Sequence, residues 1–187
     1  MNKKLILVLL LLGFVALFFG ALWFYATFEG ETAAPIPVIE DSNRPAESDA
    51  YDFHAEDQAG NPVQISDYLG QRPTIVYFWA SWCTWCTRGM DELTLLYDEM
   101  GDTVQILAVN LPHLGGAPNE LAEGRALMEA RGFPFSSIYD VDGEAQALFS
   151  VTGVPRALFI DADGALVHDQ LGFLDFDGLV GIVTQLN

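Results

Sequence analysis

Basic residues are scarce in this sequence, and lysine is absent after Lys4. Beyond that point six arginines stand against all 26 acidic residues, and the formal net charge of the whole chain is −18 at pH 7. Such a surface repels polyanions. We therefore expect no nucleic-acid partner and no binding to anionic lipid headgroups. The excess of acid is typical of a highly soluble surface.

Cysteine is also scarce, with two residues in 187, and histidine occurs three times. Two cysteines cannot build the disulfide framework of a small secreted domain. His54, His113 and His168 are widely separated and lack metal-ligand spacing, so we expect no zinc or other resident metal. As a structural staple, Cys83 and Cys86 would close too short a loop to stabilise the fold much.

Long hydrophobic runs are absent except at the start of the chain. An apolar stretch, residues 5–28, follows Lys3 and Lys4, and its roughly 24 positions can cross a bilayer as a helix. The stretch is longer than a signal-peptide core, and the charges around it place the N-terminus in the cytoplasm. We predict a single-pass, uncleaved signal anchor in the cell membrane, with the catalytic domain extracytoplasmic. The alternative, a signal cleaved near Ala33 and Ala34, gives the same compartment.

Residues 29–50 lack a periodic apolar face. They are rich in acidic and small residues and contain Pro35, Pro37 and Pro45, a composition typical of an extended tether. Residues 51–187 have the length and the apolar content of one domain. The predicted organisation is therefore a membrane anchor at 1–28, an acidic tether at 29–50 and a folded domain at 51–187.

The patterning of the folded domain predicts an α/β architecture. A nearly continuous apolar run at 74–79 is typical of a central strand covered on both faces. Strand and helix signals alternate around it. The other expected strands are 53–56, 63–65, 104–109, 137–139, 157–160 and 165–168, and the expected helices run from the cysteines to Gly101 and over 118–131, 143–149 and 176–186. This order predicts a central mixed β-sheet flanked by helices, with a β-hairpin at its N-terminal end.

The two cysteines stand directly behind the central run, at the expected start of a helix, with Trp82 before them and Trp85 between them. A thiol at a helix N-terminus faces unpaired backbone N–H groups and the positive end of the helix dipole. This lowers its pKa and makes Cys83 the expected nucleophile. Cys86 lies in the first turn, close enough to attack a mixed disulfide at Cys83 and release the partner. The spacing therefore predicts thiol-disulfide exchange.

These motifs resemble the thioredoxin superfamily, in particular the membrane-anchored TlpA/ResA-like thiol-disulfide reductases. The resemblance rests on the early hairpin, on residues 78–83 leading to the dithiol, on an insert between Asn110 and Arg131, and on the segment 153–155. It implies a thioredoxin-like fold in which Pro155 is cis and faces the cysteines. It also implies a substrate groove made of Trp82, Thr84, Trp85, Val154, Pro155 and Arg156.

The same resemblance implies the activity, which is the reduction of protein disulfides with no cofactor other than the redox-active pair Cys83 and Cys86. Protein thiols and disulfides are the implied substrates, for example apocytochrome c in cytochrome c biogenesis. The implied electron donor is a membrane protein of the CcdA type. We expect the chain to act as a monomer in cell redox homeostasis.

Three positions depart from the family pattern. Many relatives have proline where this chain has Trp85, whose apolar indole is expected to desolvate Cys86 and keep its pKa up. Relatives place an acid, the proton acceptor for the second cysteine, where this chain has Tyr77 or Gly89. From the sequence alone, Gly89→Glu is expected to speed the second step, and Glu92 is a candidate proton relay acting through water.

Three alternative functions are compatible with the residues. A protein thiol oxidase would share every catalytic residue and would differ only in redox potential. A peroxidase of the related peroxiredoxin class typically carries threonine where this chain has Ala80. A copper-binding or copper-delivery module would combine the dithiol with a histidine such as His168.

Overall fold

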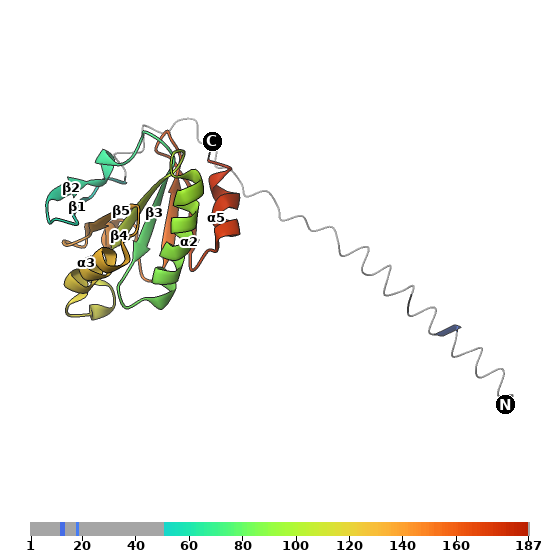
Figure 1. The fold of residues 1–187 in the computed structure, drawn as a ribbon, viewed down its shortest axis with the longest axis horizontal. Coiled ribbons are helices and arrows are strands. Elements are labelled where there is room, and N and C mark those ends of the chain that lie inside the picture. Colours follow the sequence, from blue (N-terminus) through green and yellow to red (C-terminus); the bar gives the residue numbers. More distant parts are fainter. Residues whose placement is uncertain (1–11, 14–17, 19–50, 187) are drawn as a thin grey trace, which may run out of the picture. The chain divides into compact units, whose positions relative to one another are not determined.

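The structure is a computed structural model that describes residues 12, 13, 18 and 51–186. The chain divides into two units, Met1–Glu40 and Asp41–Asn187, and the fold in Figure 1 is that of residues 51–186 in the second unit. The predicted anchor and tether lie outside the described residues, apart from positions 12, 13 and 18. Among the residues that the structure describes, no helix is long and apolar enough to span a bilayer.

A seven-stranded mixed sheet forms the centre of the domain, in the order β2-β1-β5-β4-β3-β6-β7 (Figure 1). Strand β3 (Thr74–Trp79) is buried along its whole length. It lies between β4 (Gln105–Asn110), which is parallel to it, and β6 (Arg156–Ile160), which is antiparallel. The predicted central strand is therefore confirmed. The remaining strands are β1 (His54–Asp57), β2 (Pro62–Gln64), β5 (Ser136–Tyr139) and β7 (Leu166–Leu171).

Helices cover both faces of this sheet. On one face, α2 (Thr84–Met100) and α5 (Phe176–Val183) lie side by side, and α3 (Glu120–Arg131) follows β4 beside them (Figure 1). On the other face lie the short helix α4 (Glu144–Leu148) and the 3₁₀ turn η2 (Ile65–Asp67). A second 3₁₀ turn, η3 (Leu114–Gly116), precedes α3.

Strand alternation divides the core into two apolar clusters. Ile75, Tyr77 and Trp79 of β3 belong to the cluster that contains both cysteines and the buried residues of α2 and α5. Val76 and Phe78 belong to the cluster on the α4 face. Because successive side chains of a strand point to opposite faces, a single apolar run supplies both clusters.

The predicted elements agree with the observed ones in type and order, and they differ at their ends. Strand β7 continues to Leu171 instead of 168, because it pairs with β6 as far as the contact between Arg156 and Leu171. Helix α3 begins at Glu120 instead of 118, since Asn119 is its N-cap. It ends at Arg131, as predicted, and Gly132 caps it with φ at 60°, where glycine carries no steric penalty.

Candidate active site

Cys83 and Cys86 lie where β3 leads into α2, and a disulfide joins them. Cys83 is the N-cap of α2, and its Sγ accepts a hydrogen bond from the backbone N–H of Cys86 at 3.1 Å. The predicted position at a helix start is therefore confirmed. An N–H group directed at Sγ stabilises negative charge on that sulfur, which supports Cys83 as the nucleophile of the reduced protein.

Burial separates the two cysteines. Cys83 is 6% exposed, whereas Cys86 is completely buried. Both belong to the apolar cluster behind α2. A substrate sulfur can therefore approach Cys83 from solvent, while Cys86 is reached only through Cys83, which supports the resolving role for Cys86.

The segment before β6 lies directly against the nucleophile. The Val154–Pro155 peptide bond is cis, as the resemblance to the thioredoxin superfamily implies. The carbonyl oxygen of Val154 is 3.8 Å from Cys83 Sγ. A peptide lying along residues 154 and 155 would therefore bring its own sulfur close to Cys83.

Two tryptophans flank the nucleophile at the surface. Trp82 is 50% exposed and Trp85 is 56% exposed, and Thr84 between the two cysteines is exposed as well. The indole of Trp82 lies on Gly115, where an added Cβ would be 3.0 Å from the ring. The predicted groove residues of this segment are thus accessible to a partner.

Trp85 lies at the surface next to its chain neighbour Cys86. Its indole packs against Phe173, with 5.5 Å between the ring centroids. Cys86 itself is completely buried and belongs to the core cluster that also contains Tyr77 and Met90. The core therefore contributes to the burial of this thiol, and the desolvation of Cys86 by the Trp85 indole stays a prediction.

The loop between β7 and α5 adds one apolar residue that the sequence analysis missed, Phe173. The backbone N–H of Gly172 before it donates to the carbonyl of Pro155 at 2.8 Å, which ties this loop to the cis-proline segment. Leu171, the last residue of β7, pairs with Arg156 in the sheet, so its exposed side chain lies on the same face as Arg156. No local pattern joins this loop to the distant cysteines. We refer to Trp82, Trp85 and Phe173 as the apolar rim.

The guanidinium of Arg156 does not join the rim. It donates to both carboxylate oxygens of Asp169, at 2.8 and 2.6 Å, and to the carbonyl of Phe149 at 2.7 Å. The hydrogen bonds to Asp169 raise the pKa of Arg156. Ala157 faces the cluster of the cysteines, so its neighbour in the strand faces the opposite side of the sheet. The side chain of Arg156 therefore lies away from the predicted groove, and only its backbone adjoins Pro155.

Tyr77 and Gly89, the two positions where the resemblance implies an acid, lie against each other behind Cys86. The Tyr77 hydroxyl donates to the carbonyl oxygen of Cys86 at 3.2 Å. A Cβ at Gly89 would overlap Tyr77 Oη and would lie 3.1 Å from Cζ. Burial raises the pKa of Tyr77 above its usual range, so this phenol keeps its proton at neutral pH and is a donor rather than a base.

A buried carboxylate, Glu120, holds the loop that leads to Cys83. It is 1% exposed and accepts hydrogen bonds from the backbone N–H of Ser81 at 2.5 Å and from the Ser81 hydroxyl at 2.6 Å. The side-chain amide of Asn110 donates to it at 2.8 Å. The sequence analysis missed this residue, because Ser81 and Glu120 are 39 positions apart and no spacing rule links them.

Glu92, the candidate proton relay, lies on α2 beyond Cys86. Its Oε2 accepts the backbone N–H of Phe176 at 3.1 Å, which joins α2 to the start of α5. This contact gives Glu92 a structural task, and its relay role stays a prediction. His168, the copper ligand of the alternative function, packs against Phe159 with 5.7 Å between the ring centroids and the ring planes tilted by 57°. Over the described part of the chain, no cluster of three or more His, Cys, Asp or Glu residues could hold a metal.

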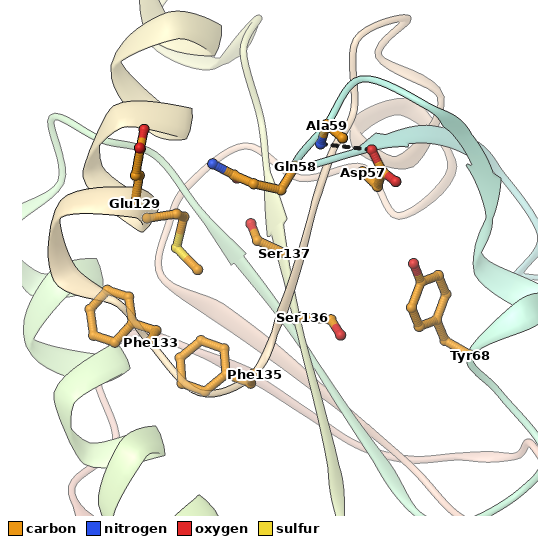
Figure 2. Close-up of a pocket in the computed structure, with 10 residues that line it drawn as sticks. Asp57, Gln58, Ala59, Tyr68, Glu129, Phe133, Phe135, Ser136 and Ser137 are labelled. Carbon is orange, nitrogen blue, oxygen red and sulfur yellow. Dashed lines mark hydrogen bonds between the residues drawn. The ribbon is translucent and has the colours of Figure 1, made fainter.

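A hollow of about 700 Å³ lies elsewhere on the domain, where residues of β1, α3 and β5 meet (Figure 2). Phe133 and Phe135 stack on one side of it, with 5.5 Å between their centroids, and Tyr68 lies on the other side. Neither cysteine lines this hollow. This hollow is therefore separate from the dithiol.

Comparison with known proteins agrees with this site. The family model described as the AhpC/TSA family matches residues 46–169. The thiol:disulfide interchange protein DsbE of Allochromatium vinosum is 28% identical over 158 residues, which cover 83% of this chain and 79% of the relative. The thiol-disulfide oxidoreductase ResA of Oceanobacillus iheyensis is 29% identical over 133 residues, which cover 71% of this chain and 66% of the relative.

Solved structures give the same result for the fold. The crystal structure of the exposed lipoprotein thioredoxin of Streptococcus pneumoniae superposes with a TM-score of 0.62 at 26% identity. The match covers 72% of this chain and 99% of that chain. The thioredoxin-like fold expected from the sequence is therefore confirmed, and so is the resemblance to ResA-like proteins.

Proposed function

The chain belongs to the AhpC/TSA family, and from that premise we propose that it reduces disulfides of protein substrates outside the cytoplasm. It is a thiol-disulfide oxidoreductase of the DsbE and ResA type. The observation that carries the proposal is the placement of Cys83, which caps α2, lies 3.8 Å from the Val154 carbonyl and borders the exposed apolar rim. An exposed apolar surface of this kind fits a protein segment.

The first step uses the reduced protein. The thiolate of Cys83 attacks one sulfur of a substrate disulfide, and the substrate S–S bond breaks as the new S–S bond forms. The second substrate sulfur leaves as a thiolate and takes up a proton. During attack, the substrate backbone lies along Val154 and Pro155 as an added extended segment.

The second step releases the substrate. Cys86 loses its proton, and its thiolate attacks Cys83 Sγ, which breaks the mixed disulfide and forms the Cys83–Cys86 disulfide. Two electrons have then passed to the substrate, whose two sulfurs leave as thiols. The phenol of Tyr77 keeps its proton, so water or the departing substrate thiolate accepts the proton of Cys86.

A dithiol donor must then reduce the Cys83–Cys86 disulfide before the next cycle. We propose a membrane protein of the CcdA type for this role and cytochrome c biogenesis as the setting. The similarity to the DsbE and ResA relatives supports this setting, and it agrees with the prediction of an anchor at residues 1–28.

Two single variants test the assigned roles. Cys83→Ser is expected to abolish insulin reduction with a dithiol donor, because the nucleophile is gone. Cys86→Ser is expected to accumulate a mixed disulfide with the substrate, visible by non-reducing electrophoresis, because nothing can release it. If Cys83→Ser were the variant that trapped substrate, the assignment would be wrong.

The direction of electron flow is tested in cells. Thiol trapping of the wild-type chain reports the redox state of Cys83 and Cys86. A reductase is expected to be mostly reduced at steady state. A mostly oxidised pair would show that the chain is an oxidase, which uses the same residues in the opposite direction.

A further inference from the structure

The arginines of the described domain are almost all engaged. Four of the five donate to a carboxylate or a carbonyl: Arg72 to Gly101, Arg125 to Glu56, Arg131 to Asp91 and Arg156 to Asp169. Arg88 is the exception, since within residues 51–186 no hydrogen bond or ion pair holds its guanidinium. Arg88 is thus the described arginine that has neither a carboxylate nor a carbonyl partner, in a chain with 26 acidic residues.

Arg88 lies at the edge of the active site. It is one helical turn beyond Trp85 on α2, so the two side chains share a face of the helix. Its guanidinium carbon is 5.4 Å from the centroid of the Trp85 ring and 5.2 Å from that of Phe173. Both rings belong to the apolar rim. The only unpaired arginine among the described residues therefore lies beside the proposed substrate surface.

Stacking on aromatic rings leaves the N–H groups of a guanidinium free at its edges. Such a group is held in place by cation–π contact and is only partly hydrated. A planar fork of N–H donors matches a carboxylate, which can accept two of them at once. The geometry is therefore that of an open carboxylate receptor.

We propose that Arg88 binds a carboxylate of the protein substrate, so that the preferred substrate segment carries aspartate or glutamate, together with apolar residues, close to its reactive cysteine. This inference rests on the proposed function and specifies its substrate class. The excess of acidic residues on the rest of the domain disfavours docking of such a segment there, so the attraction at Arg88 also favours docking beside the dithiol.

The test compares two peptides in reactions with purified full-length protein. Each peptide contains one disulfide flanked by apolar residues, and the cysteines are bordered by aspartates in one peptide and by lysines in the other. Rates of reduction are divided by the rates with dithiothreitol alone, because neighbouring charges change the intrinsic reactivity of a disulfide.

The variants are Arg88→Gln, Arg88→Lys and, as a matched control, Arg131→Gln. Arg131 also lies over an aromatic ring, that of Phe133, at 5.2 Å.

Arg88→Gln is expected to slow reduction of the aspartate peptide by about threefold to tenfold and to leave the lysine peptide within about twofold. Arg88→Lys is expected to retain part of the rate because it keeps the charge, and Arg131→Gln is expected to change neither peptide. The effect of Arg88→Gln should shrink as salt is raised.

The outcomes separate the two proposals. If the wild type reduces insulin and both peptides but Arg88→Gln slows both equally or neither, Arg88 is not a carboxylate receptor. If the wild type reduces neither insulin nor the peptides, the proposed function is wrong and this inference is wrong with it.

Discussion

Tyr77 and Gly89, the two positions where the resemblance implies an acid, make one contact in the core. The phenol lies against the glycine backbone and donates to the Cys86 carbonyl at 3.2 Å. A tyrosine at position 77 requires the absence of a side chain at position 89, because the two compete for one space. The two departures from the family pattern are therefore a single packing solution.

Gly89→Ala tests this contact. The new Cβ would overlap Tyr77 Oη inside the core, and overpacking of this kind costs about 1–3 kcal/mol of unfolding free energy. Tyr77→Phe alone is expected to cost about 1 kcal/mol, since the Cys86 carbonyl loses a donor. Combined, the two substitutions are expected to cost less than their sum, because Tyr77→Phe removes the overlapping atom. Urea unfolding measures all four proteins, and strict additivity would contradict the contact.

The Gly89→Glu substitution is corrected by the same geometry. From the sequence it is expected to supply a base and speed the second step. In the structure, its Cβ meets the Tyr77 hydroxyl before any carboxylate can be placed. The expected result is now loss of stability without faster decay of the mixed disulfide, which stopped-flow kinetics can measure.

Among the elements, α3 stabilises the loop between β3 and α2. Its first residue, Glu120, binds Ser81 on this loop and Asn110 at the end of β4. The glycine of η3, Gly115, supports Trp82 from the same side. The insert between β4 and β5 thus positions the residues that precede Cys83.

Glu120→Ala is expected to cost about 2–4 kcal/mol, because the Ser81 N–H and the buried Asn110 amide lose their acceptor. Glu120→Gln keeps one oxygen in place and is expected to cost about 1 kcal/mol. Insulin reduction should fall in the alanine variant and recover in the glutamine variant. Equal stability and activity of both variants would contradict a positioning role for the carboxylate.

The carboxyl group of Asp140, which binds the start of α4, is expected to make the stability of the domain depend on pH. Asp140 accepts the backbone N–H groups of Ala145 and Gln146 at 3.0 and 2.9 Å. Burial raises the pKa of Asp140, and these hydrogen bonds oppose the rise only in part. The folded protein therefore binds this proton more tightly than the unfolded chain does, so stability falls as pH rises from about 3.9 through the raised value.

Asp140→Asn isolates this contribution. The difference in unfolding free energy between wild type and variant, followed from pH 3 to 6, is expected to move in favour of the variant as pH rises. Urea titrations at each pH measure it, and the other carboxyl groups cancel in the difference. A difference that is flat, or that moves toward the wild type, would show that the capping hydrogen bonds outweigh burial.

At the level of the whole chain, the residues that form the site all lie within 51–186, in the unit Asp41–Asn187. A chain without residues 1–28 is therefore expected to reduce insulin within about twofold of the full-length rate, since the chemistry needs only the dithiol and its surroundings.

The full-length chain is expected to stay in the membrane fraction through high-salt and alkaline washes. A mature N-terminus near Pro35 would overturn the anchor.

The sequence by itself determined the elements and the place of Cys83 at the start of a helix. The apolar run at 74–79 is a strand, and Cys83 caps the helix behind it, because strand burial and helix capping depend on residues that are neighbours in the chain. The cis bond before Pro155 followed from the resemblance. These features needed no knowledge of distant contacts.

Only the tertiary structure decided what surrounds the dithiol. Phe173 joins Trp85, Glu120 reaches Ser81, and Arg156 turns to the far face of the sheet. Each of these contacts joins residues that are distant in sequence, and strand register and helix packing set them rather than any local pattern. Arg88 and Arg156 illustrate the difference: both are arginines near the predicted site, but only the fold shows that Asp169 binds one of them and that the other is free to meet a substrate.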